Sequence, residues 1–178
     1  MTAYDWLLIF SGVGIVVLFA VLRMVRALFA LVTVWTATLL SAALYQEAAF
    51  RLQAVASQNP TLVRGLVFDS LLLIFFIAGL ILVRIAFPVT KLPSLGILDH
   101  LMGLALGGIV AVIMVALLVN SLGVMILEPW ETDEAGWAAL RSAYLASGLR
   151  PFTAPILATY SWAFVPFFQG LPPVLLPQ

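Results

Sequence analysis

The chain has 178 residues, of which 64% are hydrophobic and 9% are charged, and its formal net charge is zero. Soluble domains carry roughly 25% charged residues, because a soluble fold must present polar groups to water. The composition therefore excludes an ordinary soluble domain and predicts an all-α integral membrane protein surrounded by the lipid bilayer. The neutral charge provides no overall basic field for nucleic acid, and the absence of cysteine excludes disulfides and thiol chemistry.

Four apolar stretches are each long enough to cross the hydrocarbon core of a bilayer, which takes about 20 helical residues. They are residues 4–22, 27–45, 65–83 and 101–127. No basic segment precedes the first stretch, so we expect a retained span rather than a cleaved signal peptide. The predicted organisation is a four-helix membrane domain over residues 1–127, followed by an extracytoplasmic, partly interfacial tail over residues 128–178.

The connections between these stretches differ in length and composition. Residues 23–26 leave so little room that the first two spans are expected to form a tight antiparallel hairpin. Residues 46–64 are rich in polar side chains and predict a loop. Residues 84–97 contain Pro88 and Pro93, which end helices and stiffen the connection.

Basic residues predict the orientation of the spans, because lysine and arginine favour the cytoplasmic side of short loops. The two short connections lie on one side of the membrane and contain Arg23, Arg26, Arg84 and Lys91. These residues predict the cytoplasmic face, where Arg84 and Lys91 are expected to reach lipid phosphates. Both termini are then expected on the extracytoplasmic side.

The tail changes character along its length. Residues 128–136 are acidic and predict a loop, whereas apolar residues recur after it at helical spacing and predict a short amphipathic helix on the membrane surface. These residues are Trp137, Leu140, Tyr144 and Leu145. Residues 155–168 are too short and too interrupted by proline for a fifth span, so an interfacial or re-entrant segment is predicted.

Small residues at four-residue spacing predict helix-packing faces, because helices in membranes associate through close contact at small side chains. One stripe in the fourth stretch consists of Gly103, Gly107 and Ala111. A second stripe in the second stretch consists of Thr33, Ala37 and Ser41. The partner of each face is either another helix of the chain or a second membrane protein, including a second copy.

Polar positions inside the apolar stretches raise the question of a transport path. Asp69 is expected in the first turn of its helix, where its charge suits the helix N-terminus. Asn120 and Ser121 are expected to form an interhelical hydrogen bond or to lie at the interface. A small transporter or channel subunit is the alternative, in which these groups line a polar path.

Asp99 and His100 stand at the entrance to the uncharged stretch at residues 101–127, and His100 is the only histidine. An acid at a helix N-terminus accepts hydrogen bonds from free backbone N–H groups, so Asp99 predicts a cap or first-turn acid at the cytoplasmic face. Asp99 is also placed to pair with Arg23, Arg26 or Lys91. His100 is predicted to be an interfacial polar anchor.

The chain offers little that points to catalysis. A single histidine cannot form a histidine metal cluster, and adjacent residues on a helix do not face each other. No GxSxG, P-loop or Rossmann motif is present. We therefore predict no catalytic residues, no metal and no cofactor, and a protein that is not an enzyme.

Three stretches resemble the colicin V production protein family (CvpA-like bacterial membrane proteins). They are the basic turn at residues 22–35, the sequence LDHLMGLALGG at residues 98–108, and SGLRP at residues 147–151. The second is similar to a family pattern of Asp-Arg-x-x-Gly-x-x-x-Gly, with His100 at the arginine position. The resemblance implies a bacterial inner-membrane protein associated with production of a secreted peptide toxin, and other members are linked to envelope stress tolerance.

The expected function is accordingly that of a non-enzymatic inner-membrane factor. It would act in toxin production, in secretion or in envelope homeostasis, through helix-packing contacts with a membrane-protein partner or in a homo-oligomer. The alternatives are a small transporter or channel subunit and a membrane scaffold for an envelope enzyme. No nucleic-acid partner is expected.

Overall fold

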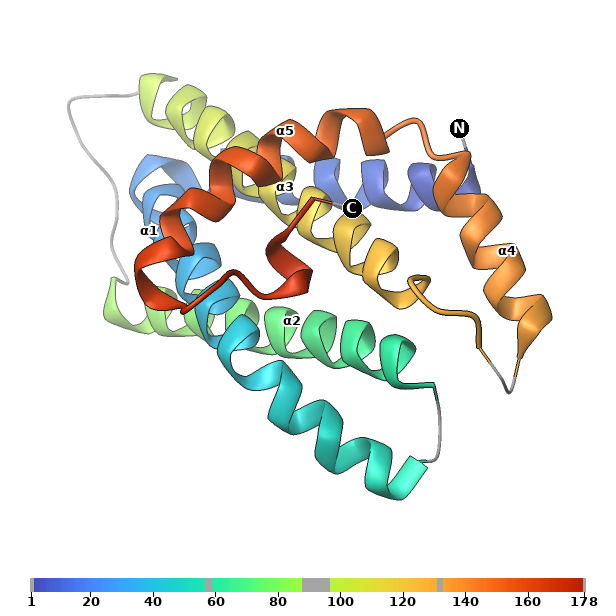
Figure 1. Ribbon diagram of the computed structural model, residues 1–178. Helices are drawn as coiled ribbons and strands as arrows, with labels where there is room; N and C mark the ends of the chain where they lie inside the picture. The colour runs from blue at the N-terminus through green and yellow to red at the C-terminus, as the bar shows by residue number, and fades with distance from the viewer. Residues whose placement is uncertain (1, 57–58, 88–96, 131–132, 178) are drawn as a thin grey trace.

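The structure is a computed structural model that describes residues 2–56, 59–87, 97–130 and 133–177 (Figure 1). Every regular element in these ranges is helical, which confirms the predicted all-α fold class. The elements are α1 (Ala3–Ala56), α2 (Pro60–Ala86), α3 (Ile97–Met125), α4 (Glu134–Leu145), α5 (Arg150–Ser161) and the 3-10 helices η1 (Trp162–Phe167) and η2 (Pro173–Leu175).

Among the described residues, three helical segments are long and apolar enough to cross a membrane. They are Met24–Gln53, Pro60–Ala86 and Ile97–Met125. The earlier part of α1, Asp5–Val21, is also apolar but shorter. The part of the chain that the structure describes therefore offers three candidate spans, and α2 is the least buried of them.

The first two predicted spans are not separated by a turn at residues 23–26, because the backbone stays helical through these residues and α1 is a single element of 54 residues. The chain nevertheless changes direction within α1. Figure 1 shows its first, dark-blue part and its second, lighter-blue part running in clearly different directions. Neither Gly nor Pro stands between Arg23 and Arg26, so the bend has another cause, which lies in α3.

The predicted polar loop at residues 46–64 is also wrong, because α1 continues to Ala56 and α2 begins at Pro60. The polar side chains here occupy the outer face of a helix, where Arg51 Nε donates to Glu47 Oε1 at 2.9 Å. The inner face buries Tyr45 and Ala49. Pro60 suits the first turn of α2, where no intrahelical N–H bond is needed.

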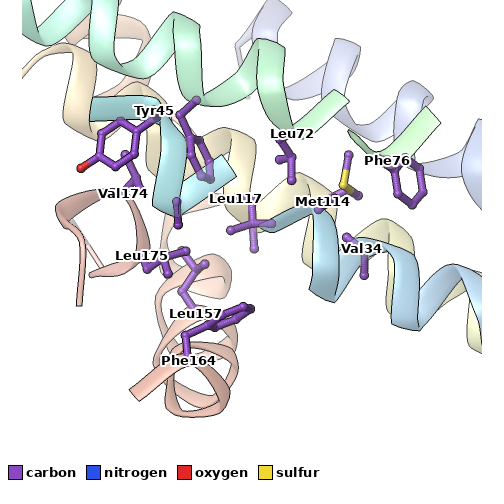
Figure 2. Close-up of a cluster of buried hydrophobic side chains, with 14 of the residues drawn as sticks. Val34, Tyr45, Leu72, Phe76, Met114, Leu117, Leu157, Phe164, Val174 and Leu175 are labelled. Atoms are coloured by element: carbon purple, nitrogen blue, oxygen red, sulfur yellow. The ribbon is translucent and has the colours of Figure 1, made fainter. Parts of the chain in front are cut away.

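One hydrophobic core joins the three long helices to the C-terminal tail. α1 supplies Val34 and Tyr45, while α2 and α3 supply side chains such as Leu72 and Leu117, as Figure 2 shows. The fully buried side chains of the tail include Leu157, Phe164, Val174 and Leu175. The tail is therefore part of the same packed body and not a separate unit.

The tail follows the predicted elements in part. The predicted amphipathic helix is present as α4, whose first turn is capped by Asp133 Oδ1 accepting from the Gly136 N–H at 2.8 Å. Residues 155–168 form the second half of α5 and the whole of η1. With 12 residues, α5 is too short to cross a hydrocarbon core of about 30 Å.

Candidate functional site

Asp99 and His100 lie in the first turn of α3 and contact the bend of α1. Asp99 is 1% exposed, although it is an acid in an apolar setting. Its Oδ1 accepts a hydrogen bond from the backbone N–H of Met24 at 3.0 Å. His100 Nδ1 lies 2.9 Å from the backbone carbonyl oxygen of Ala20. Because a carbonyl oxygen only accepts, His100 Nδ1 must carry the proton and donate.

These two contacts fall on one rung of α1. In a regular α-helix the N–H of Met24 donates to the carbonyl oxygen of Ala20, four residues earlier. In this structure both groups have a partner in α3, through two side chains that are adjacent in the sequence. Side chains that enter the hydrogen-bond ladder are a recognised cause of sharp helix kinks. Asp99 and His100 therefore account for the bend.

The N–H of Met24 and the carbonyl oxygen of Ala20 need hydrogen-bond partners, because an unpaired backbone group costs free energy in an apolar environment. Asp99 acts as an N-terminal cap for the second part of α1, and His100 acts as a C-terminal cap for the first part. Asp99 is a first-turn acid of α3, as the sequence indicates, but its Oδ1 bonds to the backbone of another helix. His100 is exposed, and its bond to α1 was not foreseen.

The glycine stripe of α3 faces the first part of α1. A Cβ placed on Gly107 would lie only 2.6 Å from Cβ of Phe19, which is closer than real Cβ contacts. Gly103 and Ala111 are buried on the same stripe. The partner that the sequence left open is therefore a helix of the same chain, at least at Gly107.

The second stripe is buried within the chain as well. Thr33, Ala37 and Ser41 are each at most 6% exposed. A Cβ placed on Gly79 of α2 would clash with Cγ2 of Thr33, so α1 and α2 cross closely at this point. The role of Gly79 was missed, because no second small residue at four-residue spacing marks it.

The predicted cytoplasmic-face residues are brought together in part. Arg26 Nη2 donates to the carbonyl oxygen of Phe87, at the end of α2, at 3.5 Å. Phe87 also stacks on Phe29, with ring centroids 4.3 Å apart. Arg26 and Arg84 line one cavity between α1 and α2. Lys91 and the side chain of Arg23 lie outside the described residues.

Asp69 is not in a first helical turn, which corrects the sequence prediction. α2 begins at Pro60, so Asp69 lies in its third turn. Its Oδ2 accepts from Ser121 Oγ of α3 at 2.8 Å, and Ser121 also approaches the carbonyl oxygen of Leu118. The pair joins α2 to α3 inside two candidate spans. The predicted interhelical hydrogen bond therefore exists, with Asp69 as its acceptor.

Asn120 holds the C-terminal tail on α3. Its amide group donates to the carbonyl oxygens of Val174 and Leu176, each at 2.9 Å, and the residue is 3% exposed. Tyr160 of α5 bonds to Thr38 of α1, with the two hydroxyl oxygens 3.1 Å apart. Burial raises the pKa of Tyr160, so its hydroxyl stays protonated. These bonds were missed, because polar residues so far apart in sequence carry no local signal of their pairing.

Asp5 forms a further clamp between distant parts of the chain. Its carboxylate accepts from Ser147 Oγ and from the N–H of Gly148 at 3.2 Å, and also from the N–H of Thr2 at 2.8 Å. Ser147 and Gly148 begin the SGLRP stretch. Asp5 is fully buried, so this acid fixes the turn between α4 and α5 to the start of α1.

The chemistry of the site is that of backbone capping and helix packing. Among the described residues, no group of three histidine, cysteine, aspartate or glutamate side chains is placed to hold a metal ion. The side chains that are brought together satisfy one another or backbone groups at helix crossings. Comparisons with protein-family models, with curated proteins and with solved structures find no match to this chain.

Proposed function

We propose that this chain is a non-enzymatic bacterial inner-membrane protein of the colicin V production type. Its role would be in toxin production or secretion, or in envelope homeostasis, through contacts with membrane-protein partners. The observation that carries the proposal is the contact between Asp99 and the backbone of Met24. Met24 lies in residues 22–35 and Asp99 in residues 98–108, which are the two leading stretches of the resemblance. Their direct contact means that they form one structural unit.

Contacts with a partner would use surfaces other than the two small-residue stripes, because both stripes are buried inside the chain. α2 presents the most apolar surface outward, including Ile74, Ile81 and Ile85, which are each more than half exposed. Such surface suits lipid or another transmembrane helix.

The membrane topology in this proposal has four spans, with both termini outside the cytoplasm. Three candidate spans support it, and the apolar segment Asp5–Val21 supplies a fourth on the other side of the α1 bend. The bend would lie at the cytoplasmic face. Its basic residues then follow the positive-inside rule.

Cysteine labelling tests this topology, because the chain has no cysteine of its own. Arg51→Cys, Ala138→Cys and a cysteine added before Met1 should all react with an impermeant maleimide on intact spheroplasts. Phe87→Cys should react only after permeabilisation. All four positions should label fully in detergent, which controls for access. If the N-terminal cysteine, like Phe87→Cys, reacts only after permeabilisation, then α1 crosses the membrane once. That result would contradict the four-span arrangement.

A transporter is the second candidate, and Asp69 is the observation that favours it. A carboxylate inside a membrane span is costly and often marks an ion or proton pathway. Asn120 gives no such support, because its amide group bonds to two carbonyl oxygens of the tail. A transport role would therefore depend on Asp69 and Ser121.

A deletion strain tests the two functions together. Loss of the protein should lower export of a peptide toxin or lower survival under envelope stress, and the wild-type chain should restore it. Asp69→Asn keeps an oxygen acceptor for Ser121 but removes the carboxylate. If the protein does not transport ions or protons, this variant should complement the deletion strain as well as the wild-type chain does. Failure of Asp69→Asn at normal protein levels would favour transport. A deletion strain with neither defect would contradict the proposed function.

A further inference from the structure

A cavity of about 610 Å³ lies between the bend of α1 and the C-terminal part of α2. Its wall is mostly apolar, and this wall consists of Leu18, Phe19, Ile77, Leu80, Ile81 and Val83. Its volume falls within the range of about 300–1,000 Å³ that is typical of small-molecule sites. Leu18, Ile77 and Ile81 are about half exposed, so the cavity opens sideways along the helices.

The only charged side chains that line this cavity, among the described residues, are Arg26 and Arg84. No described acidic residue lines it, so the cavity combines two positive charges with an apolar wall. Guanidinium groups bind phosphate through paired hydrogen bonds. The cavity therefore complements a molecule with an anionic phosphate at one end and a hydrocarbon chain at the other.

Arg26 is also held in place before any ligand binds. Its Nη2 donates to the Phe87 carbonyl oxygen at 3.5 Å, and the stacked rings of Phe29 and Phe87 fix that carbonyl group against α1. Arg84 lies in the last turn of α2, just before Phe87. A site whose groups are already positioned loses less entropy on binding.

We propose that this cavity binds one anionic phospholipid, with its phosphate between Arg26 and Arg84 and an acyl chain along the apolar wall. The proposal rests on the membrane placement given above, because a cavity that opens sideways then opens toward lipid. A net negative headgroup is favoured over a zwitterionic one, because no described acid at the cavity would pair with a positive headgroup amine. A free phosphate ion would leave the apolar wall uncovered.

Native mass spectrometry of the purified full chain tests this proposal. The protein is incubated in detergent with equal amounts of phosphatidylglycerol and phosphatidylcholine that carry the same acyl chains. Phosphatidylglycerol should be enriched in the bound fraction. Arg84→Gln should lower this enrichment about fivefold, and Arg26→Gln/Arg84→Gln should lower it further, because each basic residue near a lipid surface contributes about a fivefold preference for anionic lipid.

Arg64→Gln is the matched control, because it removes the same charge from the other end of α2, where Arg64 lines a separate cavity with Gln46 and Gln53. This variant should keep the enrichment. Ile81→Trp should reduce lipid binding with both arginines present, because it fills the cavity. Thermal unfolding of each variant shows whether it is folded, and the exposed Arg84 provides a variant that does not disturb the core.

Three results would overturn the proposal: equal enrichment in Arg84→Gln and wild type, an equal loss in Arg64→Gln, or no effect of Ile81→Trp. Displacement of the lipid by excess inorganic phosphate would indicate a site for the free ion and would also contradict it. The membrane placement is judged separately, by whether the chain sediments with membranes and requires detergent. If the chain sediments with membranes and requires detergent but shows no lipid enrichment, the lipid site is contradicted and the membrane placement is not.

Discussion

Replacing Gly107 by leucine is expected to destabilise the packing of α3 on α1 by about 1–3 kcal/mol or more, the usual cost of overpacking a close contact. A Cβ alone would lie 2.6 Å from Cβ of Phe19, and Phe19 is fully buried, so neither group has room to move aside. The contact joins two segments of one chain. The loss should therefore appear as a lower unfolding temperature of the monomer in detergent, measured by circular dichroism.

Gly108→Leu provides the matched control for this substitution. Gly108 is the next residue of α3, and a Cβ placed there meets nothing within 4 Å. Both substitutions raise helix propensity by the same amount, so the difference between them isolates the contact with Phe19. Equal unfolding temperatures for the two variants would show that α3 does not pack on α1 through Gly107.

Replacing Asp99 by alanine is expected to cost about 1–3 kcal/mol, because the backbone N–H of Met24 loses its acceptor in an apolar setting. Asp99→Asn should cost less, since an amide oxygen can accept the same hydrogen bond. Hydrogen exchange measured by NMR at the Met24 amide should quicken in Asp99→Ala. Unfolding temperatures of the two variants provide the second measurement.

Glu47→Ala is a suitable control, because Glu47 is a helical acid whose pair with Arg51 is exposed. Exposed pairs of this spacing contribute only about 0.3–0.5 kcal/mol. Asp99→Ala should therefore have a distinctly larger effect. An Asp99→Ala protein with unchanged stability and unchanged exchange at Met24 would refute the role of Asp99 at the bend.

The sequence predicted the helical class and the apolar helices because those depend on composition and on runs of uncharged residues. The loop predicted at residues 46–64 is wrong, because polar residues can also lie on the outer face of a helix. There the polar side chains lie on one face of α1, while Tyr45 and Ala49 are buried on the other. The predicted position of Asp69 in a first helical turn is wrong for a related reason. α2 begins at Pro60 and not at Gly65.

The sequence identified residues of the candidate site but not their partners. Asp99, His100 and Gly107 were selected from one short stretch, and all three contact α1. Their partners were not predictable, because the Asp99 and His100 bonds join residues 75 and 80 positions apart. A local pattern indicates that a polar group needs a partner, but it does not indicate which distant group supplies one.

By itself, the sequence determined that this protein is helical and suited to a membrane, because a chain with few charges must satisfy its backbone internally and expose apolar side chains. Only the tertiary structure decided where α1 bends, which helix lies against Gly107 and how Asn120 and Asp5 hold the tail. These features depend on contacts between distant residues. In an apolar environment each unpaired backbone group is costly, so the arrangement is decided by which side chains can reach those groups.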